Sequence, residues 1–299
     1  MSDGPTFKLP NFEVLGLLGR GGMASVWKAR QVSLDRHVAV KILASSFATD
    51  PADIKRFRIE AQSAARLKHP GIVQVYDANF SDGVYYFVME LVDGYTMGDL
   101  LRRKGHLTIE DALIVAESVA IALNYAWEEF QMVHCDIKPD NIMVDADGTV
   151  KVTDLGLCRS LSIFKSEGTG NTDEILGTPA YMSPEQVCGS DKLDCRSDIY
   201  ALGATLYHMV TGRMLFQGKT DDEMIRCHID ESQAPDVRDF MPGASNAFVL
   251  LLEKMLAKDV NHRHRDWKLV LADLSRVQNA HPPWPALLPP FGSSMKRNA

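Results

Sequence analysis

Apolar and polar residues alternate in several short runs within the first third of the chain, which is the pattern of half-buried β-strands. These runs are Phe12 to Leu18, Val26 to Ala29, Val38 to Lys41, Val73 to Ala78 and Tyr85 to Leu91. One segment between them, from Asp53 to Leu67, instead has apolar residues at helical spacing: Ile54, Phe57, Ala61 and Ala64. The pattern therefore predicts five strands and one helix in this part of the chain.

The rest of the chain has mainly helical patterns. Thr108, with Asp111 three residues later, resembles a helix N-cap, and the apolar residues that follow share one face: Leu113, Ala116, Val119, Ala120 and Leu123. Further helices are predicted from Ser197-Asp198 to Thr211-Gly212, from Ser245-Asn246 to Leu256, and from Asp266 to Val277. Prolines between His281 and Pro290 exclude a helix there, so we expect an extended tail that either packs on the helices or is loose.

Composition limits the classes of function. The chain has 299 residues, enough for one large or two medium domains. Its net charge of -7 and lack of a basic run argue against a nucleic-acid partner. No apolar run is long enough to span a bilayer, and the first ten residues do not resemble a signal peptide. The five cysteines lack paired short spacing, which favours free thiols and a cytoplasmic location.

The segment from His134 to Asn141, followed by Asp154-Leu155-Gly156, contains the residue types that phosphoryl transfer uses. Asp136 can accept a hydroxyl proton, and Lys138 can neutralise charge on the transferred group. Asn141 and Asp154 offer oxygen atoms to Mg²⁺. Taken alone, Asp154-Leu155-Gly156 would be more typical of an ordinary turn. The order of all these residues favours a phosphoryl-transfer site.

Two segments nearer the N-terminus extend this pattern. A glycine-rich turn at Gly19 to Gly22 lies between the first two predicted strands, where glycine lets backbone N–H groups approach phosphate closely. By itself it predicts only a hairpin. Lys41 ends an apolar strand pattern, and a lysine there is costly to bury unless an anion pairs with it. A nucleotide phosphate and Glu60 are the candidate anions; the alternative is that Lys41 and Glu60 are solvated surface charges.

In this order, the segments resemble the protein kinase family from about Phe12 to about Val277. The resemblance implies an α+β, bilobal fold with a small antiparallel β-sheet N-lobe that carries one helix, and a larger, mainly α-helical C-lobe. The expected boundaries are a leader at 1–10, the N-lobe at 11–91, the C-lobe at 92–278 and a proline-rich tail at 279–299.

Two motifs are similar to those of serine/threonine kinases of the bacterial, eukaryote-like (Hanks-type) branch. They are Asp136-x-Lys138 and the run Gly177-Thr178-Pro179-Ala180-Tyr181-Met182-Ser183-Pro184-Glu185. The resemblance implies ATP and Mg²⁺ as cofactors and serine or threonine hydroxyls of proteins as acceptors. It also implies that Arg263 pairs with Glu185. A nucleotide-binding pseudokinase scaffold and a small-molecule phosphotransferase of kinase-like fold remain alternatives, and the oligomeric state stays open.

The resemblance also assigns roles to single residues. The catalytic residues would be Asp136, Lys138, Lys41 and Glu60, and the metal ligands would be Asn141 and Asp154. The residues around the nucleotide would be Leu18, Gly19, Arg20, Gly21, Gly22, Val26, Ala39, Lys41, Met89, Glu90, Val92, Asn141, Met143 and Asp154. Within this set, backbone groups of Glu90 and Val92 would meet the adenine edge. The faces of the base would lie between Leu18, Val26, Ala39 and Met143.

Three positions depart from the family pattern. Ala24 replaces the third glycine of the glycine-rich turn, Leu155 replaces the usual phenylalanine, and Cys135 replaces the usual arginine between His134 and Asp136. That arginine normally meets a phosphorylated activation segment, which a neutral cysteine cannot do. We therefore expect a non-RD kinase whose activation does not strictly require phosphorylation of this segment. Its candidate autophosphorylation sites are Ser160, Ser162, Ser166, Thr169 and Thr172.

Overall fold

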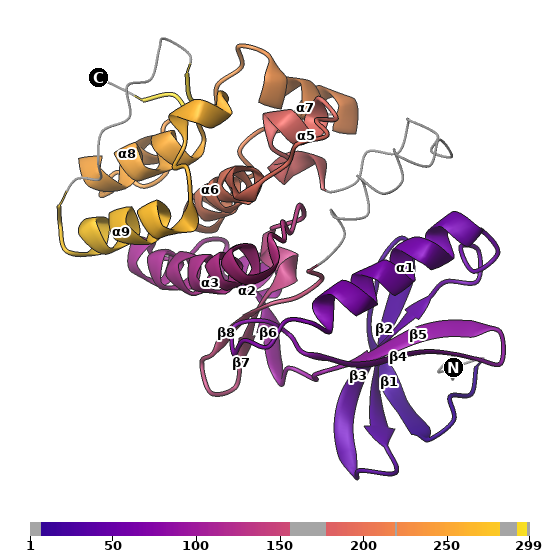
Figure 1. Cartoon of the computed structure of the whole chain (residues 1–299). Coiled ribbons are helices and arrows are strands. Elements are labelled where there is room, and N and C mark those ends of the chain that lie inside the picture. Colours follow the sequence, from indigo (N-terminus) through magenta and orange to yellow (C-terminus); the bar gives the residue numbers. More distant parts are fainter. Residues whose placement is uncertain (1–6, 156–177, 219, 282–291, 298–299) are drawn as a thin grey trace.

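The computed structural model describes residues 7–155, 178–218, 220–281 and 292–297. In this part of the chain, a lobe built on a β-sheet is followed by a lobe built mainly of helices (Figure 1). The chain passes from the first lobe to the second between Met89 and Gly94. The predicted bilobal α+β fold is confirmed.

The N-lobe contains an antiparallel sheet in the order β1-β2-β3-β5-β4. The five predicted strands are all present, with bounds that differ by a few residues: β1 (Phe12–Arg20), β2 (Ala24–Gln31), β3 (Arg36–Leu43), β4 (Val75–Ser81) and β5 (Val84–Met89). A turn at Asp82-Gly83 joins β4 to β5, with φ of 50° at Asp82 and 79° at Gly83. Two consecutive positive φ angles are what a two-residue hairpin of this kind needs, and Asp-Gly supplies them.

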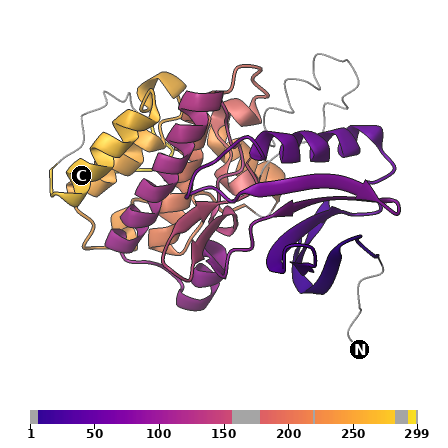
Figure 2. The same cartoon turned by 60° about the horizontal axis from the view of Figure 1, so that its bottom comes forward.

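The alternation of side chains along β3 determines where Lys41 points. Val38, Val40 and Ile42 pack into an apolar cluster on one face of the sheet, with Trp27 and Ala29. The intervening residues of β3 therefore lie on the opposite face, because successive side chains of a strand alternate. There Ala39 and Leu43 pack with Phe57 and Ala61 of α1 (Pro51–Ala64). Lys41 shares this face and so faces α1, which lies across the sheet (Figure 2).

Helix α1 presents its buried side to the sheet. It begins after Asp50, whose side chain accepts a hydrogen bond from the Ala52 backbone N–H, and proline follows at the first helical position. Phe57, Ala61 and Ala64 are buried, as their spacing predicts. Glu60 lies on the same side and is only 5% exposed. The helix thus carries a carboxylate toward the face that holds Lys41.

The C-lobe is built around α6, almost all of whose residues are buried. Its helices are α2 (Met97–Lys104), α3 (Ile109–Phe130), α5 (Pro184–Val187), α6 (Cys195–Thr211), α7 (Asp221–Ile229), α8 (Asn246–Met255) and α9 (Trp267–Gln278). A small sheet of β6 (Gly94–Thr96), β7 (Ile142–Asp145) and β8 (Val150–Val152) lies at the boundary with the N-lobe. No helix among the described residues is both long enough and apolar enough to cross a membrane.

Most of the predicted helix starts are confirmed. Thr108, Ser245 and Asp266 each accept a backbone hydrogen bond as N-caps of α3, α8 and α9. The predicted start of α6 at Ser197-Asp198 is wrong. The helix begins at Cys195 because Asp194 accepts the Arg196 N–H, and Asp198 lies inside the helix.

The tail packs on the C-lobe over residues 292–297, where Ser294 and Met295 are buried. One of the two predicted alternatives for the tail, packing on the helices, is therefore confirmed for this stretch. The prolines from Pro282 to Pro290 lie outside the described residues, as do the candidate phosphorylation sites from Ser160 to Thr172.

Replacing Ser245 by alanine should lower the free energy of unfolding by about 1 kcal/mol, because the Phe248 N–H loses its side-chain acceptor. Ser245 is exposed, so no packing is lost. Urea denaturation measures the effect, and Ser245→Asp, which retains a cap, is the matched control. Equal stabilities for the alanine and aspartate variants would contradict this account of the cap.

Candidate active site

An ion pair links the two lobes at their boundary. The ammonium of Lys41 on β3 donates to Glu60 Oε1 at 2.6 Å and to Asp154 Oδ1 at 2.9 Å. Glu60 comes from α1 and Asp154 follows β8 in the C-lobe, so three separate segments meet at one nitrogen. The pair expected between Lys41 and Glu60 is present, and Asp154 is a second partner.

The pKa values of these groups follow from burial and from their mutual charges. Burial alone would lower the pKa of Lys41, but the charges of Asp154 and Glu60 outweigh it and raise the pKa. Burial also opposes ionisation of Asp154, yet the Lys41 charge holds the Asp154 pKa below its ordinary value. For Glu60, burial dominates and raises the pKa. Lys41 therefore stays cationic at neutral pH.

Asp154 has an unusual backbone conformation, with φ of 60°. This left-handed region is uncommon for residues other than glycine, although aspartate tolerates it better than most. It turns the carboxylate toward Lys41, while the next residue, Leu155, is buried at 2% exposure. Apolar side chains line the small cavity beside Glu60 and Asp154, among them Ala64, Val75, Phe87 and Leu155. Charges in such surroundings interact more strongly than they do in water.

The loop from His134 to Asn141 is anchored by the buried carboxylate of Asp198 on α6. The backbone N–H groups of His134 and Cys135 both donate to this carboxylate, each at 2.7 Å. Burial raises the pKa of Asp198 to about 6, although these two donors and His134 favour its ionised form. The His134 ring accepts from the Asp136 N–H at Nδ1, so Nε2 carries the proton that it donates to the Thr153 carbonyl. This last bond ties the loop to the residue before Asp154.

The carboxylate of Asp136 accepts four hydrogen bonds. Oδ2 accepts from Lys138 Nζ at 2.7 Å and from Asn141 Nδ2 at 3.0 Å. Oδ1 accepts from the backbone N–H and the hydroxyl of Thr178, at 3.0 and 2.9 Å. Lys138 also donates to that hydroxyl at 2.6 Å, so Lys138, Asp136 and Thr178 form a closed polar triangle. A carboxylate fixed in this way can meet a substrate hydroxyl without first reorganising.

The orientation of Asn141 bears on metal binding. Its Nδ2 donates to the Asp136 carbonyl at 2.8 Å as well as to the Asp136 carboxylate. The amide oxygen is therefore turned away from Asp136 and is the atom that Asn141 would offer to a cation. An amide oxygen and the Asp154 carboxylate are hard donors of the kind that Mg²⁺ prefers, and Mg²⁺ commonly takes its other ligands from phosphates and water. The donor set fits the expected metal.

All but one of the apolar residues expected around adenine fall into one cluster. Ala39, Met89 and Val92 are buried together, and Val26 and Met143 pack against them. Leu18 is 52% exposed and lies outside this cluster. Gly19 and Arg20 end β1, and Gly21 and Gly22 form the turn before β2, where the Gly21 N–H donates to the Ala24 carbonyl at 2.8 Å. The predicted hairpin is thus present.

Lys151 is an interlobe residue that the sequence analysis missed. Its ammonium lies 2.9 Å from Glu90 Oε1 and donates to the Pro70 carbonyl at 2.9 Å. Glu90 in turn accepts from the Gln74 backbone N–H. A lysine between Val150 and Val152 in a strand is the same signal that singled out Lys41, because such a lysine needs a partner. Applied a second time, it would have indicated that Lys151 needs a partner, but not that this partner is Glu90.

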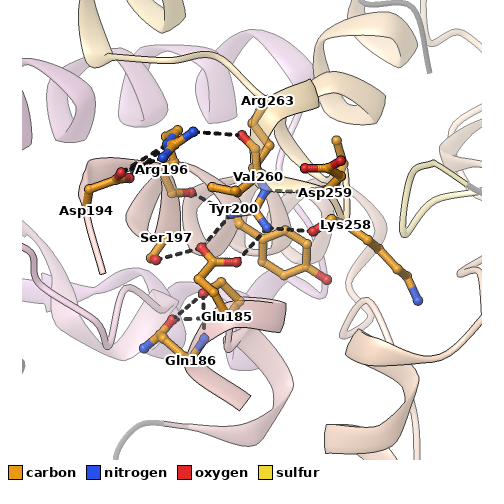
Figure 3. Close-up of polar contacts among 12 residues, drawn as sticks. Glu185, Gln186, Asp194, Arg196, Ser197, Tyr200, Lys258, Asp259, Val260 and Arg263 are labelled. Atoms are coloured by element: carbon orange, nitrogen blue, oxygen red, sulfur yellow. Dashed lines mark hydrogen bonds and ion pairs between the residues drawn. The ribbon is translucent and has the colours of Figure 1, made fainter. Parts of the chain in front are cut away.

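The segment that contains Thr178 is anchored at its far end by Glu185 and Arg263 (Figure 3). The guanidinium of Arg263 donates to both oxygens of Glu185, at 2.7 and 2.8 Å, and Ser197 donates to Oε1 at 2.6 Å. The pair expected from the sequence is present. Burial would raise the pKa of Glu185, but the hydrogen bonds and charge of Arg263 outweigh it and lower the pKa. Arg263 also donates to the Ala257 and Lys258 carbonyls, so its position is fixed.

One expectation about the cysteines is wrong. Cys188, Cys195 and Cys227 are free thiols. Cys135 is instead disulfide-bonded, and its side chain is buried. Its carbonyl accepts a hydrogen bond from Gln186 Nε2 at 2.8 Å, which links the loop to α5. Cys158, Gly156 and Gly177 lie outside the described residues.

Comparison with known proteins identifies consistent relatives. The protein kinase domain family matches residues 12–271. The serine/threonine-protein kinase PrkC of Bacillus subtilis is 38% identical over 269 residues, which are 90% of this chain and 41% of PrkC. The serine/threonine-protein kinase PknB of Mycobacterium tuberculosis is 38% identical over 283 residues, 93% of this chain and 45% of PknB. The chain therefore spans less than half the length of these two relatives.

Solved structures agree on the fold. The crystal structure of the Mycobacterium tuberculosis PknI kinase domain superposes with a TM-score of 0.70 at 25% identity. The superposition covers 92% of this chain and 99% of that one.

Replacing Arg263 by methionine should lower the free energy of unfolding by about 3–5 kcal/mol, because the largely buried Glu185 carboxylate loses its counterion. Adding Glu185→Gln to this variant should recover part of the loss, since no uncompensated charge then remains. The control is Arg265→Met, because Arg265 is 81% exposed and its pair with Asp266 should contribute at most about 1 kcal/mol. Guanidinium denaturation measures the free energy of unfolding of each variant. Equal losses of stability in Arg263→Met and Arg265→Met would refute the role of Arg263 as the counterion of Glu185.

Proposed function

Since the chain belongs to the protein kinase family, with serine/threonine kinases among its relatives, we propose that it transfers the γ-phosphoryl group of ATP to serine and threonine hydroxyls of proteins. The observation that carries this proposal is the pair of linked centres described above. One centre holds Lys41 between Glu60 and Asp154, and the other orients the Asp136 carboxylate. Phosphoryl transfer depends on such positioning and on stabilisation of charge more than on covalent chemistry by the protein.

In this proposal, ATP lies between the lobes beneath the Gly19–Gly22 turn. Lys41 meets the inner phosphates, and Glu60 keeps its ammonium in place. The apolar cluster of Ala39, Met89 and Val92 receives the adenine, as apolar slots with few polar groups do in other ligand sites. Mg²⁺, when bound, would be held by Asp154 and Asn141 and would neutralise charge on the phosphates.

The acceptor hydroxyl would meet the Asp136 carboxylate. As the acceptor oxygen forms its bond to the γ-phosphorus, the bond from that phosphorus to the β–γ bridging oxygen breaks, and ADP leaves. The hydroxyl proton passes to Asp136. Lys138, bound to Asp136 and Thr178, places a positive charge beside the transferred group. The Thr178 contact explains how a docked peptide segment could be aligned with the base. The need for ATP implies that the domain acts in the cytoplasm.

Replacing Asp136 by asparagine should lower kcat by about 10²–10⁴-fold, because the variant cannot accept the proton. Nucleotide affinity, measured by calorimetry with an ATP analogue and Mg²⁺, should change little. The matched control is Asp147→Asn, which alters an exposed turn carboxylate whose bond to the Thr149 N–H an amide oxygen can keep. Undiminished transfer by Asp136→Asn would refute the role of Asp136.

The same assay distinguishes the alternatives. Labelled ATP is supplied with Mg²⁺ or with EDTA, and transfer is measured to the chain itself, to a generic basic protein, and to small alcohols and amines. Mg²⁺-dependent transfer to protein supports the proposal. Nucleotide binding without any transfer would identify a pseudokinase scaffold, and transfer only to small molecules would identify a small-molecule phosphotransferase.

We further propose that activation does not require phosphorylation of the segment after Asp154. The family's usual arginine in the catalytic loop is replaced here by Cys135, whose buried side chain carries no cation for a phosphate to meet. Asp136 is already oriented by Lys138, Asn141 and Thr178.

Complete dephosphorylation should therefore leave kcat within about twofold of the starting value, because no charge-assisted contact of the loop is lost. Mass spectrometry confirms removal of phosphate before the activity is measured. The control is an arginine-containing kinase treated with the same phosphatase, which should lose activity. Loss of activity by this chain would contradict the proposal.

A further inference from the structure

The tail segment, residues 292–297, lies between two parts of the C-lobe and is hydrogen-bonded to both. On one side, the Ala234 N–H donates to the Ser294 carbonyl at 2.7 Å, and the Lys296 N–H donates to the Ala234 carbonyl at 2.8 Å. On the other side, the Ser294 N–H donates to the Leu256 carbonyl at 2.8 Å, and the Lys258 N–H donates to the Gly292 carbonyl at 2.9 Å. Main-chain bonds of this kind are how an added strand gains affinity for its site.

Side chains fix the register of the tail segment. Met295 is 1% exposed and belongs to the hydrophobic core of the C-lobe. Ser293 donates to the Glu253 carbonyl at 2.9 Å, and the Arg297 guanidinium lies 3.1 Å from the Glu253 carboxylate. Burial of one methionine and these backbone bonds make the docked position specific.

Two chains of contacts connect the tail segment to residues 178–187, which we call the substrate platform. The first passes through Leu256, Ala257 and Lys258. The tail segment bonds to one side of this stretch, while Arg263 donates to the Ala257 carbonyl at 2.6 Å and to the Lys258 carbonyl at 3.1 Å. Arg263 is the residue that anchors Glu185 at the end of the platform.

The second chain of contacts passes through Tyr200 on α6. Its hydroxyl lies 2.7 Å from Ser294 Oγ and 2.7 Å from His228 Nδ1 on α7. Its ring lies beside the Arg263 guanidinium, 4.9 Å from ring centre to the guanidinium carbon (Figure 3). Helix α7 also packs against the turn at Pro179–Tyr181 within the platform. Tyr200 therefore touches the tail segment, the anchor and a neighbour of the platform.

We propose that the docked tail segment is a positioning element for the substrate platform, so that its release weakens the binding of protein substrates. This inference rests on the proposed kinase activity. Release would open the space filled by Met295, remove a partner from the buried Tyr200 hydroxyl, and let water approach the Arg263–Glu185 pair. Polar contacts in such a site are strong because water is excluded, so they weaken when water enters. The nucleotide site, beyond the catalytic loop, should be little affected.

The test uses the full chain. Met295→Asp should release the tail segment, because an unpaired carboxylate is too costly to bury in the core. We expect KM for a protein substrate to rise roughly tenfold, equivalent to the loss of about one well-placed polar contact. KM for ATP should stay within about twofold, since no nucleotide contact changes. The control is Lys296→Ala, because the side chain of Lys296 is exposed and its backbone bonds remain.

Rescue in trans gives a readout that general damage would not show. A synthetic peptide of residues 292–297, Gly-Ser-Ser-Met-Lys-Arg, is added to the Met295→Asp chain at millimolar concentration. It should restore KM, whereas the same peptide with aspartate for methionine should not. If Met295→Asp fails to fold, Tyr200→Phe replaces it, because that variant keeps the ring beside Arg263 and removes only the hydroxyl. A raised KM for protein substrate would then support the proposal, and an unchanged KM would overturn it.

Amide hydrogen exchange tests the positioning role of the tail segment independently of the proposed kinase activity. Release of the tail segment should speed amide exchange in residues 256–263 and in the platform, whether or not any phosphate is transferred. If the parent chain phosphorylates no protein, the proposed kinase activity is refuted. Amide hydrogen exchange then tests by itself whether the tail segment orders the platform. The positioning role is overturned if the amides of the tail segment exchange faster in Met295→Asp while those of the platform, and KM, do not change.

Discussion

The ion pair of Lys41 with Glu60 and Asp154 is the constraint on which the arrangement of the two lobes depends. A buried ammonium is tolerated only beside opposite charge, and here the two carboxylates come from α1 and from the C-lobe. Displacing α1 from the sheet, or rotating one lobe away from the other, would leave a charge without a partner in apolar surroundings. The pair therefore favours the observed arrangement of the two lobes, and its ammonium is the group that the proposed function assigns to the phosphates of ATP.

The same logic organises the C-lobe. Asp198 is buried in α6 and accepts hydrogen bonds from two backbone N–H groups of the loop from His134 to Asn141. Arg263 is buried and forms a bidentate ion pair with Glu185, a geometry that the single ammonium of a lysine could not reproduce. In each case a charge far along the sequence holds a short segment in place: the loop from His134 to Asn141, and the short helix α5. The helices supply the rigid frame, and buried charge determines how the loops lie on it.

The sequence predicted the features that depend on local rules. Alternation of apolar residues predicted the strand β3 that carries Lys41. Thr108, Ser245 and Asp266 correctly predicted helix starts, because an N-cap acts on a backbone N–H within the next three residues. Long-range features were harder to predict. The start of α6 was misplaced because Asp194 and Ser197 are both good caps, and only packing shows that Asp198 faces inward. The Lys151–Glu90 contact and the docking of residues 292–297 depend on distant partners, which no single-sequence pattern reveals.

Thr178 has a consequence of a different kind. Its backbone N–H and hydroxyl donate to the Asp136 carboxylate, and its hydroxyl accepts from Lys138, so the segment that begins at Thr178 and the proposed base share hydrogen bonds. Thermodynamic linkage makes this coupling reciprocal. If orientation of the Asp136 carboxylate stabilises the ordered segment, ordering of the segment stabilises the oriented carboxylate by the same free energy. If the proposed function holds, a peptide that orders this segment would also order the Asp136 carboxylate, so the bound substrate would help to orient the group proposed to accept its proton.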